Sequence, residues 1–233
     1  MNTKNTLELI YKTLLNSFGH QNWWPGETLD EIIIGAILTQ SVNWKNVETA
    51  IEKLKLNNLC NIEQIYNANK EEIALLIRST LYYNQKAIKL KNFADFLFQI
   101  YDGNLQKLFQ TNTNIIRKQL LSINGIGEET ADSILLYAGN KCIFVIDAYT
   151  KRIFSRIGLC KSDWSYVKFQ QFIMNNIVHD IQLYKDYHAQ IVYLGKHFCK
   201  RKPLCVKCPL NNFCEKEEVI NSIDRKKMFK VGV

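Results

Sequence analysis

Four of the seven cysteines in this 233-residue chain lie within one short segment. Their spacing is C-x5-C-x2-C-x5-C, and they are Cys199, Cys205, Cys208 and Cys214. Four thiolates this close together can surround a single metal centre. A structural zinc site usually has two short C-x-x-C pairs, whereas this segment has one such pair and two wider arms. The spacing therefore favours a [4Fe–4S] cluster, with zinc as the alternative, and the odd cysteine count argues against a disulfide scaffold.

A second motif contains two glycines that are separated by one apolar residue. Gly125 and Gly127 belong to the segment Ser122-Ile123-Asn124-Gly125-Ile126-Gly127, which lies between two stretches with helical periodicity. Glycine lets the backbone turn sharply and come close to another chain. The amide groups of such a turn, and of the helix that follows it, can face an anion. The motif by itself indicates either a phosphate-binding hairpin or an ordinary connection between helices.

Asp147 follows the apolar run Ile143-Phe144-Val145-Ile146 and stands twenty residues after Gly127. An aspartate before Ala148-Tyr149-Thr150 is a good N-cap for a helix. Its carboxylate can also serve a reaction as a base or as a stabilising charge. The residue by itself favours a helix cap, with a catalytic role as the alternative.

Tryptophans form the third group of residues that could take part in chemistry. Trp23 and Trp24 precede Pro25 in an aromatic loop, and Trp44 lies shortly after Gln40. The face of a tryptophan ring attracts cationic, electron-poor rings by stacking and cation–π interaction. The alternative is that these rings form a corner of the hydrophobic core.

The chain is basic, with a formal net charge of +8 at pH 7. A basic excess favours a polyanionic partner, because phosphate contacts supply most of the non-specific affinity for nucleic acids. The longest apolar run, residues 32–38, is too short to span a membrane. Residues 1–18 lack the apolar core of a signal peptide. We therefore expect a cytoplasmic protein. Basic residues also surround the cysteine segment, at Lys196, Lys200, Arg201, Lys202 and Lys207.

Helices must position all of these residues. The chain has only 10 glycines and 3 prolines, too few for the many turns of a β-sandwich or β-barrel. Apolar residues recur at helical spacing along most of the sequence. The fold prediction is all-α with two lobes. Residues 27–141 form a helical domain that contains the hairpin, and residues 1–26 with 142–233 form a domain that contains the four cysteines. Helices are expected at residues 6–18, 30–38, 44–54, 70–79, 85–101, 115–122, 128–137, 147–157, 164–177 and 183–198.

The glycine motif and the aspartate together resemble the endonuclease III superfamily of helix-hairpin-helix DNA glycosylases. The resemblance rests on Ser122 to Gly127, Thr130-Ala131-Asp132 and Val145-Ile146-Asp147, in residue type and in spacing. The cysteine segment is similar to the [4Fe–4S] loop of that family, which has the spacing C-x6-C-x2-C-x5-C. This chain is one residue shorter in the first gap.

The resemblance assigns roles to these residues. It implies that the backbone of Gly125 and Gly127 grips a DNA phosphate and that Lys200 and Lys202 add a second grip. It implies that Asp147 acts at the sugar of a damaged base flipped out of duplex DNA. It also implies that the four cysteines hold a [4Fe–4S] cluster.

Glu129 departs from the bifunctional members of this family. Those enzymes have a lysine nucleophile in the context G-[VI]-G-[RK]-K-T-A, where this chain has Gly125-Ile126-Gly127-Glu128-Glu129-Thr130-Ala131. A carboxylate cannot form the Schiff base that begins strand scission. We therefore expect a monofunctional glycosylase, with water as the nucleophile and Asp147 as the base or the charge stabiliser.

A narrower resemblance suggests the substrate. Trp23-Trp24-Pro25, Leu38-Thr39-Gln40, Tyr83-Asn84-Gln85-Lys86-Ala87 and Asp147-Ala148-Tyr149 together are similar to 3-methyladenine DNA glycosylase III enzymes. This resemblance implies a base pocket of Trp23, Trp24 and Trp44, with Gln40 filling the gap left by the flipped base. It places Lys86 among the DNA contacts.

Two departures from that enzyme leave the substrate less well defined than the reaction. The enzyme lacks the four-cysteine segment, and its lysine near the last helix is Gln190 here. We expect a monomer that acts on duplex DNA with an alkylated purine. A mismatch or oxidised-base glycosylase with lyase activity is the first alternative, and a DNA-binding protein without catalysis is the second.

Overall fold

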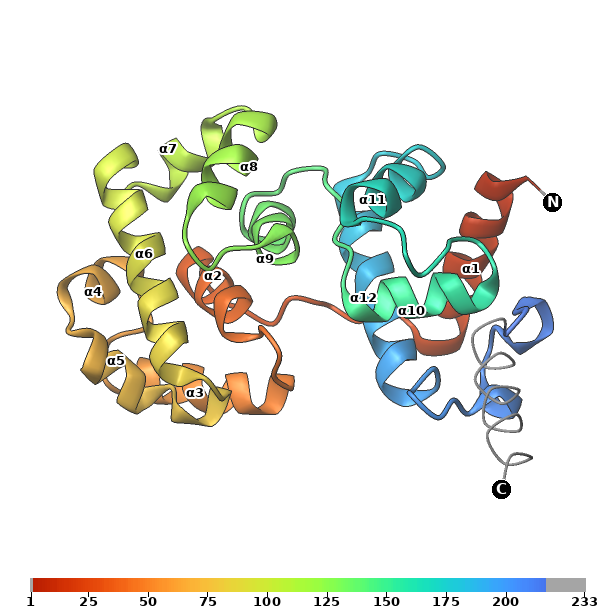
Figure 1. The fold of residues 1–233 in the computed structure, drawn as a ribbon, viewed down its shortest axis with the longest axis horizontal. Coiled ribbons are helices and arrows are strands. Elements are labelled where there is room, and N and C mark those ends of the chain that lie inside the picture. Colours follow the sequence, from red (N-terminus) through yellow and green to blue (C-terminus); the bar gives the residue numbers. More distant parts are fainter. Residues whose placement is uncertain (1, 217–233) are drawn as a thin grey trace, which may run out of the picture. The chain divides into compact units, whose positions relative to one another are not determined.

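The computed structural model describes residues 2–216, and all regular secondary structure in this range is helical. The prediction of an all-α protein is confirmed. The chain divides into two compact units (Figure 1). We call Trp24–Lys141 the hairpin unit, and Met1–Trp23 with Cys142–Val233 the cysteine unit. Residues 217–233, which belong to the domain expected to carry the cysteines, lie outside the described residues.

The hairpin unit is built around two helices, one that is buried along most of its length and one that buries a single face. α2 (Leu29–Leu38) has apolar residues on nearly every side, which is typical of a helix in the centre of a core. α6 (Tyr83–Tyr101) packs against α2, α4 and α5 through a stripe that includes Leu90, Phe93 and Leu97. The other elements are α3 (Trp44–Leu56), α4 (Ile62–Asn67), α5 (Lys70–Leu76), η1 (Arg78–Thr80), α7 (Leu105–Gln110), α8 (Thr113–Ser122), α9 (Glu128–Ser133) and the π-helical turn η2 (Ile134–Ala138).

The cysteine unit is organised around α12 (Ile181–His197). α1 (Thr3–Phe18) and α10 (Ala148–Ile157) both pack against this helix, beside which they lie in Figure 1. Tyr187 is fully buried, and its hydroxyl donates a hydrogen bond of 2.8 Å to the backbone oxygen of Leu7 on α1. The other elements are α11 (Tyr166–Met174) and two short 3₁₀ turns, η3 (Cys205–Lys207) and η4 (Asn211–Phe213).

Side-chain caps explain where many of the helices begin. A cap oxygen accepts a hydrogen bond from a backbone amide of the first turn, which otherwise lacks a partner within the helix. Asparagine is used most often, and Asp147 caps α10 as the sequence predicts. Side-chain caps are formed by Asn2, Thr28, Asn43, Asn61, Asn104, Asn112, Asp147, Ser165 and Asp180.

The main departures from the predicted helices are short elements. α4 and α7 have six residues each, so they contain too few apolar positions to show a helical period. The predicted helix at 128–137 is α9 followed directly by a π-helical turn. Within residues 2–216 no helix combines the length and the apolar character needed to cross a membrane.

Candidate functional site

The helix-hairpin-helix of the hairpin unit consists of α8, a tight turn and α9. Gly125 has φ of +95°, a left-handed conformation that favours glycine, and a Cβ atom here would clash with the side chain of Lys89. A Cβ on Gly127 would have no atom within 4 Å, so this side of the turn is open. The buried carboxylate of Asp132 accepts two hydrogen bonds from Arg117, of 2.7 and 3.0 Å, and thereby joins α9 to α8.

Gln40 lies beside this turn. Its Nε2 donates hydrogen bonds of 3.1 Å to the backbone oxygen of Gly125 and 2.9 Å to the hydroxyl of Thr130. Its Oε1 accepts a hydrogen bond from the Lys89 ammonium. Asn92 supports the same turn by donating to the backbone oxygen of Asn124 at 2.9 Å. Gln40 and the hairpin therefore form one hydrogen-bonded group on the hairpin unit.

Lys86 is buried, with 2% of its surface exposed. Its ammonium donates hydrogen bonds to the backbone oxygens of Leu38, at the end of α2, and Thr80, at the end of η1. Burial, followed by the nearby charge of Lys89, lowers the pKa of Lys86 to about 8. An ammonium held inside the unit cannot also contact a phosphate, so the interpretation of Lys86 as a DNA contact is wrong. Its position on the apolar stripe of α6, four residues before Leu90, is the signal that indicates burial.

Leu81 and Tyr82 form an exposed apolar turn that the sequence analysis missed. Both have left-handed backbone conformations, with φ of +54° and +45°, although neither is glycine. Their side chains are 56% and 73% exposed. Strained, exposed residues of this kind persist where the surrounding structure holds them in place. Here Lys86 binds the preceding residue, Thr80, and its backbone amide donates to the oxygen of Tyr82 at 3.0 Å.

The predicted base-pocket tryptophans fall into two groups. Trp24 and Trp44 lie in the hairpin unit with their ring centroids 5.2 Å apart and their planes at 87°. The ring centroid of Tyr137, on the π-helical turn, lies 5.2 Å from that of Trp24. The sequence analysis did not predict Tyr137 as a neighbour of the tryptophans. A Cβ on Gly35 of α2 would approach the Trp24 ring to 3.1 Å, so glycine leaves room for that ring. Trp23 belongs to the cysteine unit, where the Lys196 ammonium lies 5.2 Å from its ring centroid.

Asp147 begins α10 in the cysteine unit and is almost completely buried. Its Oδ1 accepts hydrogen bonds of 2.7 Å from both the backbone amide and the hydroxyl of Thr150. Its Oδ2 lies 3.7 Å from Nε2 of His188, a buried residue of α12. His188 was not among the site residues predicted from the sequence. The proximity of Asp147 and His188 depends on how α10 packs against α12.

The cysteine segment brings its four thiols to the wall of one pocket, formed by Cys199, Cys205, Cys208 and Cys214. Burial, with a smaller contribution from the other three sulfurs, raises the pKa of Cys208 to about 11. Thiols that bind a metal lose their proton. A cationic centre would therefore offset the free-energy cost of burying the charged thiolates. Within residues 2–216, no His, Cys, Asp or Glu side chains are already arranged as a metal-coordinating group. The donor set and the shared pocket fit a four-thiolate centre.

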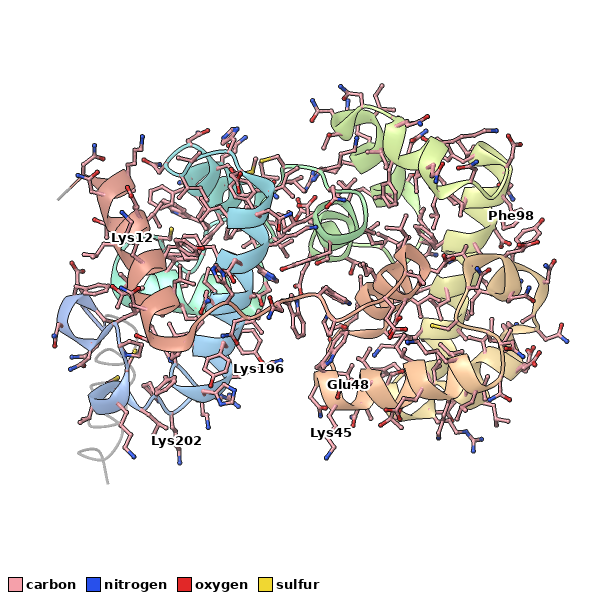
Figure 2. The ribbon with its side chains drawn as sticks, turned by 180° about the vertical axis from the view of Figure 1, so that it is seen from behind. Lys12, Lys45, Glu48, Phe98, Lys196 and Lys202 are labelled. Carbon is pink, nitrogen blue, oxygen red and sulfur yellow. The ribbon has the colours of Figure 1, made fainter. Side chains whose placement is uncertain are left out.

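α10 connects this segment to Asp147. Arg156, near the end of α10, donates hydrogen bonds to the backbone oxygen of Lys200 at 2.6 Å and to the sulfur of Cys199 at 3.4 Å. Arg152 donates to the backbone oxygen of Cys199 at 2.9 Å. Lys200 and Lys202 remain exposed at the surface, and Figure 2 shows Lys202 extending outward from this segment.

A family model described as the HhH-GPD superfamily base excision DNA repair proteins matches residues 34–178. This match covers more than half of the chain and includes both the hairpin and Asp147. The chain belongs to the HhH-GPD superfamily. It is a DNA glycosylase of base excision repair, and the predicted resemblance to endonuclease III is confirmed.

Two curated relatives support this assignment. A protein of Methanocaldococcus jannaschii, provisionally named a DNA repair glycosylase, is 48% identical over 88% of this chain and 94% of its own length. Endonuclease III of Sulfolobus acidocaldarius is 28% identical over 78% of this chain and 80% of its own.

Solved structures show the same fold. An endonuclease III in a non-covalent DNA complex has a TM-score of 0.79 at 21% identity, covering 95% of this chain and all of that one. The H. pylori 3-methyladenine DNA glycosylase bound to 1,N6-ethenoadenine has a TM-score of 0.71 at 26% identity, covering 84% of this chain and 98% of that one.

Proposed function

We propose that this glycosylase is monofunctional and releases alkylated purines, such as 3-methyladenine, from duplex DNA. The observation that carries the proposal is Glu129, an exposed residue of the first turn of α9, at the position of the lyase lysine. Without an amine at this position, water must attack the sugar and the abasic strand stays intact. The similarity to an H. pylori enzyme named for 3-methyladenine supports the choice of substrate.

Asp147 is the proposed catalytic residue. Its Oδ1 is engaged by Thr150, so the carboxylate is fixed in orientation, and Oδ2 carries the chemistry. A buried carboxylate stabilises the positive charge that develops on the sugar as the glycosidic bond breaks. The same oxygen can accept a proton from the attacking water. The glycosidic bond of an alkylated purine is already weak, so this site needs no strong acid for the leaving base.

Trp24 and Trp44 are the proposed contacts for the base. The two rings are perpendicular, and their centroids are 5.2 Å apart. A base therefore cannot be sandwiched between two parallel tryptophan rings. A base would therefore stack on the outer face of one ring, and the other ring would support it from the side. Alkylation gives the purine a positive charge, and cation–π attraction then favours the damaged base over a normal one.

The DNA grip is proposed to combine backbone and side-chain contacts. The amides of Gly125 and Gly127 approach one phosphate, and the exposed lysines Lys200 and Lys202 neutralise others. Leu81 and Tyr82 offer an apolar surface that can pack between unstacked bases. Gln40 would occupy the space of the flipped base only by leaving its hydrogen bonds with the hairpin.

Cys199, Cys205, Cys208 and Cys214 are the proposed ligands of a [4Fe–4S] cluster, with zinc as the alternative. When bound, the cluster would cross-link the arms of the segment and compensate the charge of its thiolates. Arg156 would then fix one ligand, Cys199, against the end of α10. We further propose that the protein acts as a monomer in the cytoplasm.

An excision assay tests this function. Duplexes that each contain one lesion are incubated with the protein, and strands are analysed with and without alkali. Release of 3-methyladenine with strand breaks only after alkali is expected. If the protein excises mismatched or oxidised bases well and ignores 3-methyladenine, the proposed substrate is wrong, although the reaction class remains.

A further inference from the structure

The two carboxylate oxygens of Asp147 have different surroundings. Oδ1 accepts both hydrogen bonds from Thr150 and so serves as the cap of α10. Oδ2 faces the imidazole of His188, whose Nε2 is 3.7 Å away. His188 therefore lies next to the oxygen that would carry the reaction, on the helix that packs against α10.

Both groups are removed from water, since Asp147 is 8% and His188 5% exposed. Charges interact more strongly in such surroundings than at the surface. Burial lowers the pKa of His188, and the charge of Asp147 raises it by a smaller amount. The imidazole is therefore neutral at neutral pH, and the carboxylate is not compensated by a positive charge from His188.

Several charged groups on the helices around His188 bind other partners. On α1, Tyr11 donates to Asp186 of α12 at 2.9 Å, and Lys12 pairs with Glu8 at 2.6 Å. On α10, Arg152 donates to the backbone oxygens of Gly195 and Cys199, and its guanidinium lies over the ring of Tyr149. The charge of Asp147, which faces His188 from the start of α10, raises the pKa of His188.

We propose that His188 is a positioning residue that acts through Asp147. Its neutral imidazole leaves the carboxylate charge available to the sugar, and its protonated form pairs with the carboxylate and stops base release. Protonation takes one proton from solvent and changes no other bond. The consequence is an enzyme that loses activity in mildly acidic solution through His188. This inference rests on the proposed role of Asp147.

The pH dependence of base release tests this role. Single-turnover excision is measured between about pH 5 and 8, the range over which histidine titrates, for wild type, H188Q and H179Q. His179 is an exposed histidine of the same unit, so H179Q is the matched control. The wild type and H179Q should lose activity together as the pH falls. H188Q should keep its plateau rate to lower pH, because glutamine cannot take up the proton.

The expected difference is large. One pH unit below the wild-type midpoint, the rates normalised to each plateau should differ by about tenfold, since only about one histidine in ten is then neutral. Superimposed profiles of wild type and H188Q would overturn the proposal. Full activity of D147N would instead refute the proposed catalytic role of Asp147, so the two failures are distinguishable.

A second measurement does not require H188Q to fold. The His188 ring is titrated by NMR in the wild type and in D147N. Loss of the Asp147 charge should lower the pKa of His188 further, because that charge raises it in the wild type. An unchanged His188 titration in D147N would show that the two groups are not coupled and would overturn the proposal.

Discussion

The ammonium of Lys86 donates a hydrogen bond of 2.9 Å to the backbone oxygen of Leu38, 48 residues earlier in the chain. Leu38 ends α2 immediately before Thr39 and Gln40. The second bond of the same ammonium reaches Thr80, immediately before the Leu81–Tyr82 turn. One buried lysine thus fixes the starting points of two segments that are proposed to touch DNA.

K86M should destabilise the protein without changing how its DNA affinity depends on salt. Methionine keeps the apolar stem but leaves two buried backbone oxygens without donors, a loss of about 1–3 kcal/mol in the free energy of unfolding. Thermal melting and DNA titrations over a range of salt measure the two effects. K202M is the control: it should leave the melting temperature unchanged and reduce the salt slope by about one. A reduced slope for K86M would restore Lys86 as a phosphate contact.

D147N should bind DNA and fold normally but release the base about 10²–10⁴ times more slowly. The side chains are nearly isosteric, and asparagine also caps helices well. D147A is the comparison for stability, because loss of the cap costs about 0.5–2 kcal/mol. Single-turnover excision and melting temperatures separate the roles. An inactive D147N that is also unfolded would mean that Asp147 is chiefly structural.

Borohydride should trap no covalent complex between the wild-type protein and DNA. Glu129 stands where lyase members have their lysine, so no Schiff base forms at that position. E129K is the gain-of-function variant and should show weak trapping and strand cleavage. Efficient trapping of the wild type would identify another amine as the nucleophile and contradict the monofunctional reaction.

W24A and W44A should each reduce excision of 3-methyladenine more than they reduce binding to undamaged DNA. A stacked base contributes about 1–3 kcal/mol, which corresponds to about a five- to hundredfold loss of rate. Excision rates, binding constants and melting temperatures are compared. If the rings are only core residues, truncation should cost about 3–5 kcal/mol of stability and reduce all activities together.

The purified protein should contain about four irons per chain. Iron and zinc are measured together with the visible absorption spectrum. C208S should lose most of the iron, because it removes one of four ligands, whereas C60S should retain it, because Cys60 lies in the hairpin unit, outside the cysteine segment. One zinc per chain without iron would favour the alternative metal.

The sequence by itself determined the helical fold and the family. Helical periodicity spans most of the chain, and the hairpin motif with Asp147 depends on spacing along the backbone, which any folded form must keep. The cap role of Asp147 was equally predictable, because a cap bonds only to its own first turn. The absence of a lysine at position 129 could also be seen from the sequence, because it depends only on the residue type.

Tertiary structure decided which of these side chains meet. Lys86 resembles a surface cation in sequence, but backbone oxygens from two distant segments draw its ammonium inside. The exposure of Leu81 and Tyr82 follows from left-handed backbone that no propensity predicts for these residues. His188 lies 41 residues after Asp147, and only the packing of α12 against α10 places its imidazole beside the carboxylate. Proximity between residues far apart in the chain arises from packing, so spacing along the sequence carries little information about it.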